Sequence, residues 1–300
     1  MANFAVCHKA CMDGLASAWV VNLHLPYTEI VFSSYNHEWK NDLKNRLTQD
    51  DSIYFVDFCP EPEDMISLTN DGVSFTVIDH HDSAERKIRE YDEKFKTEHM
   101  RWCHFDMEKC GSTLAWQYFQ KLTKRENERP KLLEYIEIAD IWTWRNERDR
   151  EIDCYIKAIL PPHKSIDAFQ NLVDTFDEDK AHNMGKMLYQ RMQTEVRYTV
   201  SKSCLLDFDG QEILSVNASQ HFSEVGHELA TRDEGGIGLI YIFMPENNQV
   251  KFSVRSDSNG KANKFAAKFG GGGHPDAAGF YMDVDQFHKY LKTARAIPKK

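Results

Sequence analysis

The first third of the chain alternates short apolar runs with longer amphipathic stretches. The short runs are rich in β-branched and aromatic residues, which is typical of strands, and the longer stretches repeat their apolar positions at helical spacing. Strands that alternate with helices predict a parallel sheet in which the helices are the crossover connections. The predicted strands are Asn3–His8, Ile30–Tyr35, Ser52–Phe58 and Val73–Asp79, and the predicted helices are Asp13–His24, His37–Leu47, Glu61–Thr69 and Ser83–Phe95.

The strand signal fades after about Cys110 and returns in the last third of the chain. The longest helical pattern, from Asp179 to about Ser203, is polar and nearly free of Gly and Pro, which predicts a helix that links two domains. The fold class is therefore predicted as α/β, with a parallel-sheet domain over residues 1–178, a helical linker over 179–204 and a smaller α/β domain over 205–300. The other predicted helices are Ser112–Thr123, Leu132–Trp144, Ile166–Phe176, Glu224–Arg232, Asn263–Phe269 and Gln286–Ala296, and the later strands are Leu205–Ala218, Ile237–Pro245 and Gln249–Arg255.

Polar side chains capable of binding a metal follow three of the predicted strands. Asp57 ends one apolar run, Asp79–His81 ends the next, and the first strand ends at His8, shortly before Cys11 and Asp13. Taken singly, each residue is more often a helix cap or a structural histidine. Together they converge on one edge of a parallel sheet, where their mutual repulsion would be relieved by a divalent cation. The pattern therefore predicts a metal site.

A fourth carboxylate belongs to a different part of the sequence. Asp140 lies within Tyr135–Trp144, a Trp-rich and otherwise apolar helical stretch. A carboxylate buried there is costly unless it is paired or bound to a metal, so Asp140 joins the candidate ligands.

The second domain carries a candidate anion site. Four consecutive glycines, 270–273, precede His274, and their backbone N–H groups could form a nest for a phosphate or carboxylate with His274 as a side-chain donor. The alternative is a flexible loop. Arg255, on a predicted strand, could add a bidentate phosphate contact.

Composition narrows the classes of partner. The chain has 300 residues, 41% apolar and 28% charged, and a net charge of −10, which disfavours sequence-independent binding of long duplex nucleic acid. No apolar stretch approaches the roughly 18 residues of a membrane span, and the start lacks the order of a secretory signal. Seven cysteines without a CxxC pair are expected to be reduced thiols. We therefore expect a cytoplasmic protein without a membrane partner.

The motifs, in this order, resemble the DHH phosphoesterase superfamily. They are the run from His8 through Cys11 and Asp13 to Ala18, then Val56-Asp57, Asp79-His80-His81 and Ala139-Asp140, and finally Gly270–His274 with Ala277-Ala278-Gly279. The C-terminal part is similar to the DHHA1 domain of that superfamily. The resemblance extends from His8 to Phe280. It implies a Mn²⁺-dependent hydrolase whose active site lies between a metal-binding domain and a second domain that holds phosphate.

The resemblance also implies roles for individual residues. It assigns Asp13, Asp57, His80 and Asp140 to one metal ion and His8 with Asp57 to a second, so that Asp57 bridges. Asp79 would orient a histidine and His81 would reach the substrate phosphate, which makes Asp57, Asp79, His80 and His81 the catalytic set. Substrate would also contact Arg255, Gly271, Gly272, Gly273 and His274. Cys11 stands where many members have Asp, and because a thiolate favours softer ions, the ion at His8 could be weakly held, of another identity or absent.

The activity implied is a phosphodiesterase, of the nanoRNase type, that releases mononucleotides from very short oligonucleotides, with 3′-phosphoadenosine compounds such as pAp as further substrates. Acidic charge favours short substrates over long single strands, which need an extended basic groove. Two alternatives stay open: a cyclic or linear dinucleotide phosphodiesterase, and a nucleotide-binding sensor without catalysis, for which Cys11 argues. Pyrophosphatases and exopolyphosphatases share the first domain, but the Gly-rich segment before His274 argues against them. A homodimer is compatible with the sequence.

Overall fold

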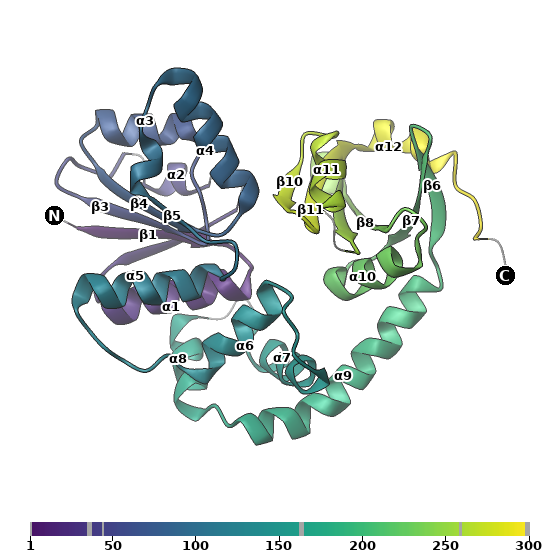
Figure 1. Cartoon of the computed structure of the whole chain (residues 1–300), viewed down its shortest axis with the longest axis horizontal. Helices are drawn as coiled ribbons and strands as arrows, with labels where there is room; N and C mark the ends of the chain where they lie inside the picture. The colour runs from purple at the N-terminus through teal and green to yellow at the C-terminus, as the bar shows by residue number, and fades with distance from the viewer. Residues whose placement is uncertain (1, 35–37, 44, 162–164, 258–259, 298–300) are drawn as a thin grey trace. The chain divides into compact units, whose positions relative to one another are not determined.

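The computed structural model describes residues 2–34, 38–43, 45–161, 165–257 and 260–297. The chain divides into an N-terminal unit, Met1–Tyr189, and a C-terminal unit, Gln190–Lys300, and each has its own sheet (Figure 1). The division falls within the long helix α9, Glu178–Val200, in the region predicted as a linker. The predicted α/β class, with a parallel sheet first and a smaller α/β unit after it, is confirmed.

The sheet of the N-terminal unit is parallel throughout, with strand order β2-β1-β3-β4-β5. Cys7 lies opposite Val56, and Val56 lies opposite Ile78, so the residues that follow them come to the same level of one sheet edge. These residues are His8, Asp57 and Asp79. The strands are β1 (Asn3–His8), β2 (Glu29–Ser33), β3 (Ser52–Val56), β4 (Ser74–Asp79) and β5 (Cys103–Phe105).

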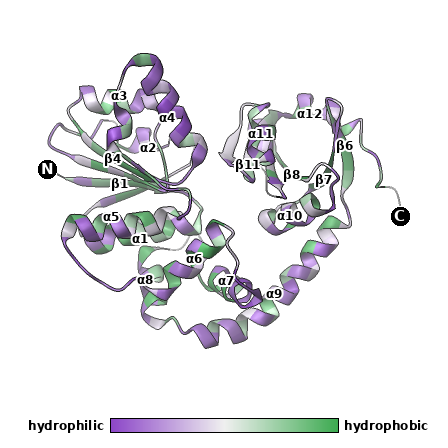
Figure 2. Cartoon of the chain, viewed as in Figure 1, coloured by the Kyte–Doolittle hydropathy of each residue, from purple (hydrophilic) through white to green (hydrophobic). Residues whose placement is uncertain are grey.

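Helices cover both faces of this sheet (Figure 1), so its strands read as continuous apolar runs. Ala5 and Cys7 of β1 belong to the core that contains α1 and α5, whereas Phe4 and Val6 belong to the core on the other face. Figure 2 shows the central strands as hydrophobic and the covering helices as mixed. The helices are α1 (Met12–His24), α2 (Trp39–Leu43), α3 (Pro62–Asn70), α4 (Asp82–Phe95), a 3-10 turn (His99–Trp102), α5 (Gly111–Thr123), α6 (Lys131–Asp140), α7 (Glu147–Ile159) and α8 (Ile166–Thr175).

The structure departs from the predicted elements in the middle of the chain. The helix predicted to Trp144 ends at Asp140, because Trp142 adopts a left-handed backbone with φ of 58°. Helix α7 was not predicted, since charged residues fill its first turn, where Asn146 caps it by accepting from the Asp149 N–H. The three-residue strand β5 is too short to produce a pattern.

The C-terminal unit contains a mixed sheet with strand order β10-β11-β9-β8-β7-β6. One face packs on α11 and α12, and the other packs on α10 and the end of α9. The strands are β6 (Cys204–Phe208), β7 (Gln211–Asn217), β8 (Ile237–Met244), β9 (Gln249–Ser256), β10 (Gly272–His274) and β11 (Ala277–Asp283), and the helices are α10 (Phe222–Arg232), α11 (Lys261–Ala267) and α12 (Val284–Leu291).

Two predicted segments of this unit have a different form. Leu205–Ala218 is a hairpin of β6 and β7, because Asp209 and Gly210 both have positive φ and turn the chain. The glycine-rich segment is neither an open nest nor a flexible loop. The N–H groups of Gly270 and Gly271 donate to carbonyls of α11, and the following residues pair with β11 as the edge strand β10.

Among the described residues, no helix has both the length and the apolar character that crossing a membrane requires.

Candidate metal centre

The turn after β3 places Asp57 at the carboxyl edge of the sheet. Asp57 has a left-handed backbone with φ of 53°, which is uncommon for a residue other than glycine. Its N–H donates to the carbonyl of Ile78 at 2.9 Å, so the neighbouring strand supports the turn. A strained conformation of this kind persists only where the surroundings hold it, and such positions concentrate at functional sites.

The first turns of two helices complete the site around Asp57. Asp13 lies in the first turn of α1, and its Oδ1 accepts from the N–H of Ser112 at the start of α5 at 3.0 Å. Gly111, the first residue of α5, lies against the site, since a Cβ added there would stand 2.6 Å from Cβ of Asp57 and 2.9 Å from Oδ2 of Asp13. Sequence reasoning missed Gly111 and Ser112, and no local pattern marks them, because their role depends on contacts across the fold.

His80 lies at the centre of the carboxylates. Its Nε2 is 3.2 Å from Oδ1 of Asp57, 3.4 Å from Oδ2 of Asp140 and 3.9 Å from Oδ2 of Asp13. The side chains of His80, Asp57 and Asp13 are buried, while that of Asp140 keeps 24% of its surface exposed. The structure thus brings together all four residues that the resemblance assigned to one ion.

A second group adjoins the first through Asp57. Nδ1 of His8 is 3.7 Å from Oδ2 of Asp57, and the ligand atoms of His8, Cys11 and Asp57 all lie within 4.8 Å of one another. Cys11 precedes α1 directly. Its side chain therefore faces the candidate site of the second ion, which supports the expectation that a thiol replaces a hard oxygen ligand there.

The electrostatics of the pocket favour a bound cation. Burial and the charge of Asp57 raise the pKa of Asp13, and burial and the charge of Asp13 raise the pKa of Asp140 to about 7. Burial alone would raise the pKa of Asp57, but its interactions with His8 and His80 outweigh this and hold the pKa below the ordinary value. Asp140 also ends α6, where the helix dipole is unfavourable to a negative charge.

The donor set fits a divalent cation. Oδ2 of Asp13 and Oδ2 of Asp57 are buried without a hydrogen-bond partner among the described residues. Buried carboxylate oxygens are costly in that state unless a proton or a cation compensates them. Carboxylate oxygens combined with imidazole suit Mn²⁺ and related ions, and these acidic and histidine clusters could therefore hold metal.

Asp79 orients the last histidine of the motif. Its Oδ1 accepts from Nδ1 of His81 at 2.7 Å and from the N–H of His80 at 2.8 Å. A carboxylate on Nδ1 favours the tautomer that keeps the proton on that nitrogen. Burial lowers the pKa of His81, but the charge of Asp79 and this hydrogen bond outweigh it and raise the pKa above its usual value.

In the C-terminal unit, hydrogen bonds from its own strand and from α10 hold the guanidinium of Arg255 in place. Its Nη1 donates to the carbonyl of Val254 and its Nη2 to Oγ of Ser223, and it makes no ion pair within 4 Å with any described residue. Burial lowers its pKa, although the charge of Glu224 opposes the shift. Gly226 makes room for it, since a Cβ there would lie 2.5 Å from Cγ of Arg255. Such a half-buried guanidinium is suited to an anion.

The structure brings together only some of the residues that were predicted to bind substrate. His274 and Arg255 share one row of the sheet, each opposite Ala277 in the register. The role of Gly271, Gly272 and Gly273 in substrate binding stays a prediction, as do the catalytic roles of the histidines and carboxylates. Sequence reasoning missed Ser223 and Gly226, which support Arg255 from a helix that precedes it by some thirty residues in the chain.

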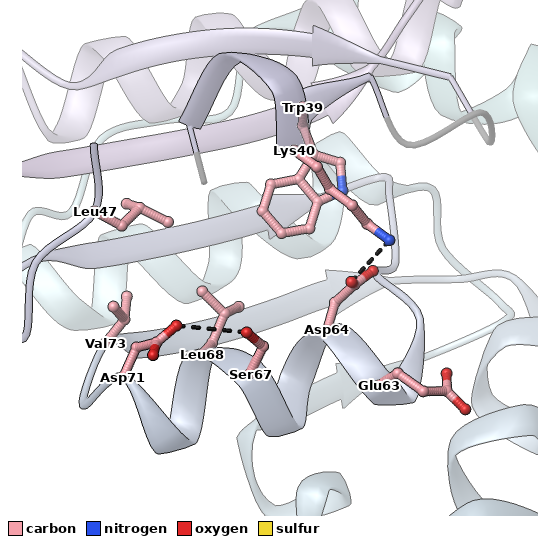
Figure 3. A pocket seen from close by; sticks show the side chains of 9 residues that line it. All are labelled: Trp39, Lys40, Leu47, Glu63, Asp64, Ser67, Leu68, Asp71 and Val73. Carbon is pink, nitrogen blue, oxygen red and sulfur yellow. Dashed lines mark hydrogen bonds and ion pairs between the residues drawn. The ribbon is translucent and has the colours of Figure 1, made fainter. Parts of the chain in front are cut away.

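A separate cavity of about 180 Å³ lies between α2 and α3 (Figure 3), away from the residues discussed above. Lys40 and Asp64 form an ion pair of 2.7 Å at its rim. The residues that line it are Trp39, Lys40, Leu47, Glu63, Asp64, Ser67, Leu68, Asp71 and Val73, and they include none of the predicted site residues.

The fold and the site define a two-unit α/β protein with a histidine and carboxylate centre at the carboxyl edge of a parallel sheet. Residues 221–300 match the family model of the DHHA1 domain. Two solved structures share the fold over 97% of this chain, each at 14% identity. They are the pGpG-specific phosphodiesterase PggH of Vibrio cholerae, with a TM-score of 0.51 and 97% of that chain covered, and the DHH domain of PF0399, a member of the s1p family of ribosomal proteins, with a TM-score of 0.57 and 85% covered.

A curated relative is the uncharacterized protein R106 of Acanthamoeba polyphaga mimivirus, which is 22% identical over 91% of this chain. The chain spans 65% of the length of that relative. The family model therefore shows a DHHA1 domain over residues 221–300, as the motifs predicted for the C-terminal part, and the rest of the chain shares its fold with the two solved structures.

Proposed function

We propose that the protein is a metal-dependent phosphodiesterase that hydrolyses very short oligonucleotides to mononucleotides. The observation that carries the proposal is the convergence of three carboxylate oxygens within 3.9 Å of Nε2 of His80, where no described residue offers a hydrogen-bond partner to Oδ2 of Asp13 or of Asp57. A cluster with this much buried negative charge is suited to divalent cations, and the superfamily is one of phosphoesterases.

Different residues of this chain would bind the metal ions, orient a histidine and hold the substrate phosphate. Asp13, Asp57, His80 and Asp140 would hold one ion and Asp57 with His8 the other; when bound, such ions supply a water of lowered pKa and neutralise charge on phosphoryl oxygens. Asp79 keeps the Nδ1 proton of His81 in place, so that the imidazole is oriented before substrate arrives. Arg255 and His274 would hold a phosphate of the substrate and turn that binding energy into orientation.

Several features support short substrates. The net charge of −10 opposes binding of long polyanions, and Arg255 offers one local, half-buried cation. Because the fold is shared with a pGpG-specific phosphodiesterase, linear dinucleotides belong in any substrate panel. Cyclic dinucleotides and pAp belong there too, since nothing in the metal centre discriminates among these phosphate esters.

Turnover of a substrate panel tests the proposal. Purified protein with added Mn²⁺ is given di- to pentanucleotides, linear and cyclic dinucleotides, pAp and polyphosphate, and products are separated by chromatography. We expect mononucleotide release from the shortest oligonucleotides and a loss of at least about a hundredfold in kcat for Asp57→Ala, because that carboxylate faces both candidate ions. Asp50→Ala, which changes an exposed carboxylate, is the matched control.

The outcomes separate the rival functions. Near-normal activity of Asp57→Ala would contradict the metal-centre assignment. Tight nucleotide binding without turnover of any substrate would favour the sensor, for which Cys11 argues. In an active enzyme, Arg255→Gln is expected to raise KM by about tenfold or more with a smaller change in kcat, since a hydrogen bond to a charged group contributes about 1.5–3 kcal/mol.

A further inference from the structure

One face of the C-terminal sheet continues beyond Arg255 as an uncovered surface. Helix α10 packs on β7, β8 and β9 on this face, whereas Tyr281 on β11 keeps 53% of its surface exposed. Side chains at alternate positions of a strand share a face, and directly opposed residues of antiparallel neighbours share it too. The register therefore gives the order of side chains across the face.

Three successive rows of this face have distinct chemistry. On β10, β11 and β9, the first row carries the anion-binding candidates, the second carries small residues, and the third carries an aromatic ring and an ammonium group. The rows, each ending on its β8 residue, are His274, Ala277, Arg255 and Gly238; then Gly272, Gly279, Ser253 and Ile240; then Tyr281, Lys251 and Ile242.

The third row is not engaged by the fold. Tyr281 makes no ring contact and no hydrogen bond with any described residue. Lys251 is exposed and forms no ion pair with any described residue. Tyr281 and Lys251 lie directly opposite each other. The same strands direct Val250, Phe252 and Met282 into the core on the other face, so Tyr281 contributes nothing to that core.

The spacing of the rows suits a chain of nucleotides. Lys251 lies four residues from Arg255 along β9, a distance of about 14 Å at the usual strand rise. Between them, on β9, β11 and β10, the second row carries only Ser253, Gly279 and Gly272, which leaves room for a sugar and base; the large side chain of that row, Ile240 on β8, packs in the core with α10. Asp283, two residues beyond Tyr281, is exposed and would repel a further phosphate.

We propose that this face is a second nucleotide subsite, in which Tyr281 stacks on a base and Lys251 contacts a phosphate of a single-stranded oligonucleotide. The proposal rests on the proposed function, and it deepens it by assigning the substrate class as oligonucleotides longer than a dinucleotide. The argument for this occupant is complementarity: an anion site at Arg255 is continuous with an aromatic surface and a cation, the combination that binds single strands.

Binding in the absence of metal tests the subsite. A fluorescently labelled tetranucleotide and dinucleotide are titrated with full-length protein in EDTA, and anisotropy gives each Kd. We expect the wild-type protein to bind the tetranucleotide more tightly than the dinucleotide. Tyr281→Ala should weaken tetranucleotide binding about tenfold, within the range measured for loss of a stacked base, and leave the dinucleotide unchanged. Tyr281→Phe should restore binding, because the ring is retained.

Matched variants and turnover complete the test. Tyr198→Ala removes another exposed tyrosine, on α9, and should leave both Kd values unchanged. Lys251→Gln should weaken tetranucleotide binding and reduce its salt dependence. Equal loss for both ligands in Tyr281→Ala, or none, would overturn the proposal. Length-dependent binding without hydrolysis in Mn²⁺ would refute the proposed phosphodiesterase and leave the subsite standing.

Discussion

Substitution of Gly111 by alanine tests the geometry of the metal centre without removing any candidate ligand. The added Cβ would stand 2.6 Å from Cβ of Asp57, 2.9 Å from its Cα and 2.9 Å from Oδ2 of Asp13. Carbon atoms in ordinary contact are about 3.5–4.0 Å apart, so either α5 or the turn at Asp57 must move by about 1 Å. Two of the three close atoms belong to the backbone or sit directly on it, and they cannot move away by a rotamer change.

The expected cost has two parts. Overpacking of this kind destabilises a protein by about 1–3 kcal/mol, and the better helix propensity of alanine offsets about 1 kcal/mol, which leaves a loss of about 0–2 kcal/mol. The displacement also moves Asp13 and Asp57 relative to His80, so Mn²⁺ affinity should fall by about 10–100-fold, as it does when residues that support metal ligands are altered.

Urea unfolding followed by circular dichroism gives the free energy of unfolding, and calorimetry gives the Mn²⁺ affinity. Gly235→Ala is the control, because among the described residues its added Cβ comes close to a side-chain oxygen of Asp233 alone, at 3.0 Å. Wild-type stability together with wild-type Mn²⁺ affinity in Gly111→Ala would show that α5 does not abut Asp57, and the reasoning about this site would be wrong.

Three further predictions concern the same centre. Without metal, the free energy of unfolding should fall as pH rises from 5 to 8. The pKa of Asp140 is raised to about 7 and that of His80 to about 10, so the folded state binds more protons than the unfolded state in this range. Asp140→Asn should flatten this profile in EDTA. With saturating Mn²⁺ the slope should reverse, since binding requires deprotonated ligands, and an unchanged slope would argue against binding here. Cys11→Asp should bind Mn²⁺ more tightly, because a hard oxygen replaces a half-buried thiol whose pKa is raised; calorimetry without a change would show that Cys11 points away from the ion.

The sequence alone was enough for the class of fold and for most of the candidate centre. Apolar runs mark strands buried on both faces, and in a parallel sheet the residues that follow such runs must meet at one edge. His8, Asp57 and Asp79 were therefore placed together by periodicity alone. The Gly-rich motif led to the DHHA1 domain, which the family model matches over residues 221–300.

The sequence could not predict the contacts that depend on packing between distant segments. Ser112 hydrogen-bonds Asp13 across 99 residues, and Gly111 is small because Asp57 lies against it. Periodicity describes only a residue's own helix or strand, so it carries no information about which neighbour a helix end will meet.

The same limit applies to the ends of elements and to the second unit. The helix pattern continued to Trp144, but the left-handed turn at Trp142 ends α6 at Asp140 and so sets where that carboxylate lies. The glycine-rich segment became an edge strand because β11 offered it a pairing partner, which outweighs the preference of glycine for open turns. Local pattern thus determined which side chains were available, and tertiary packing decided which of them touch.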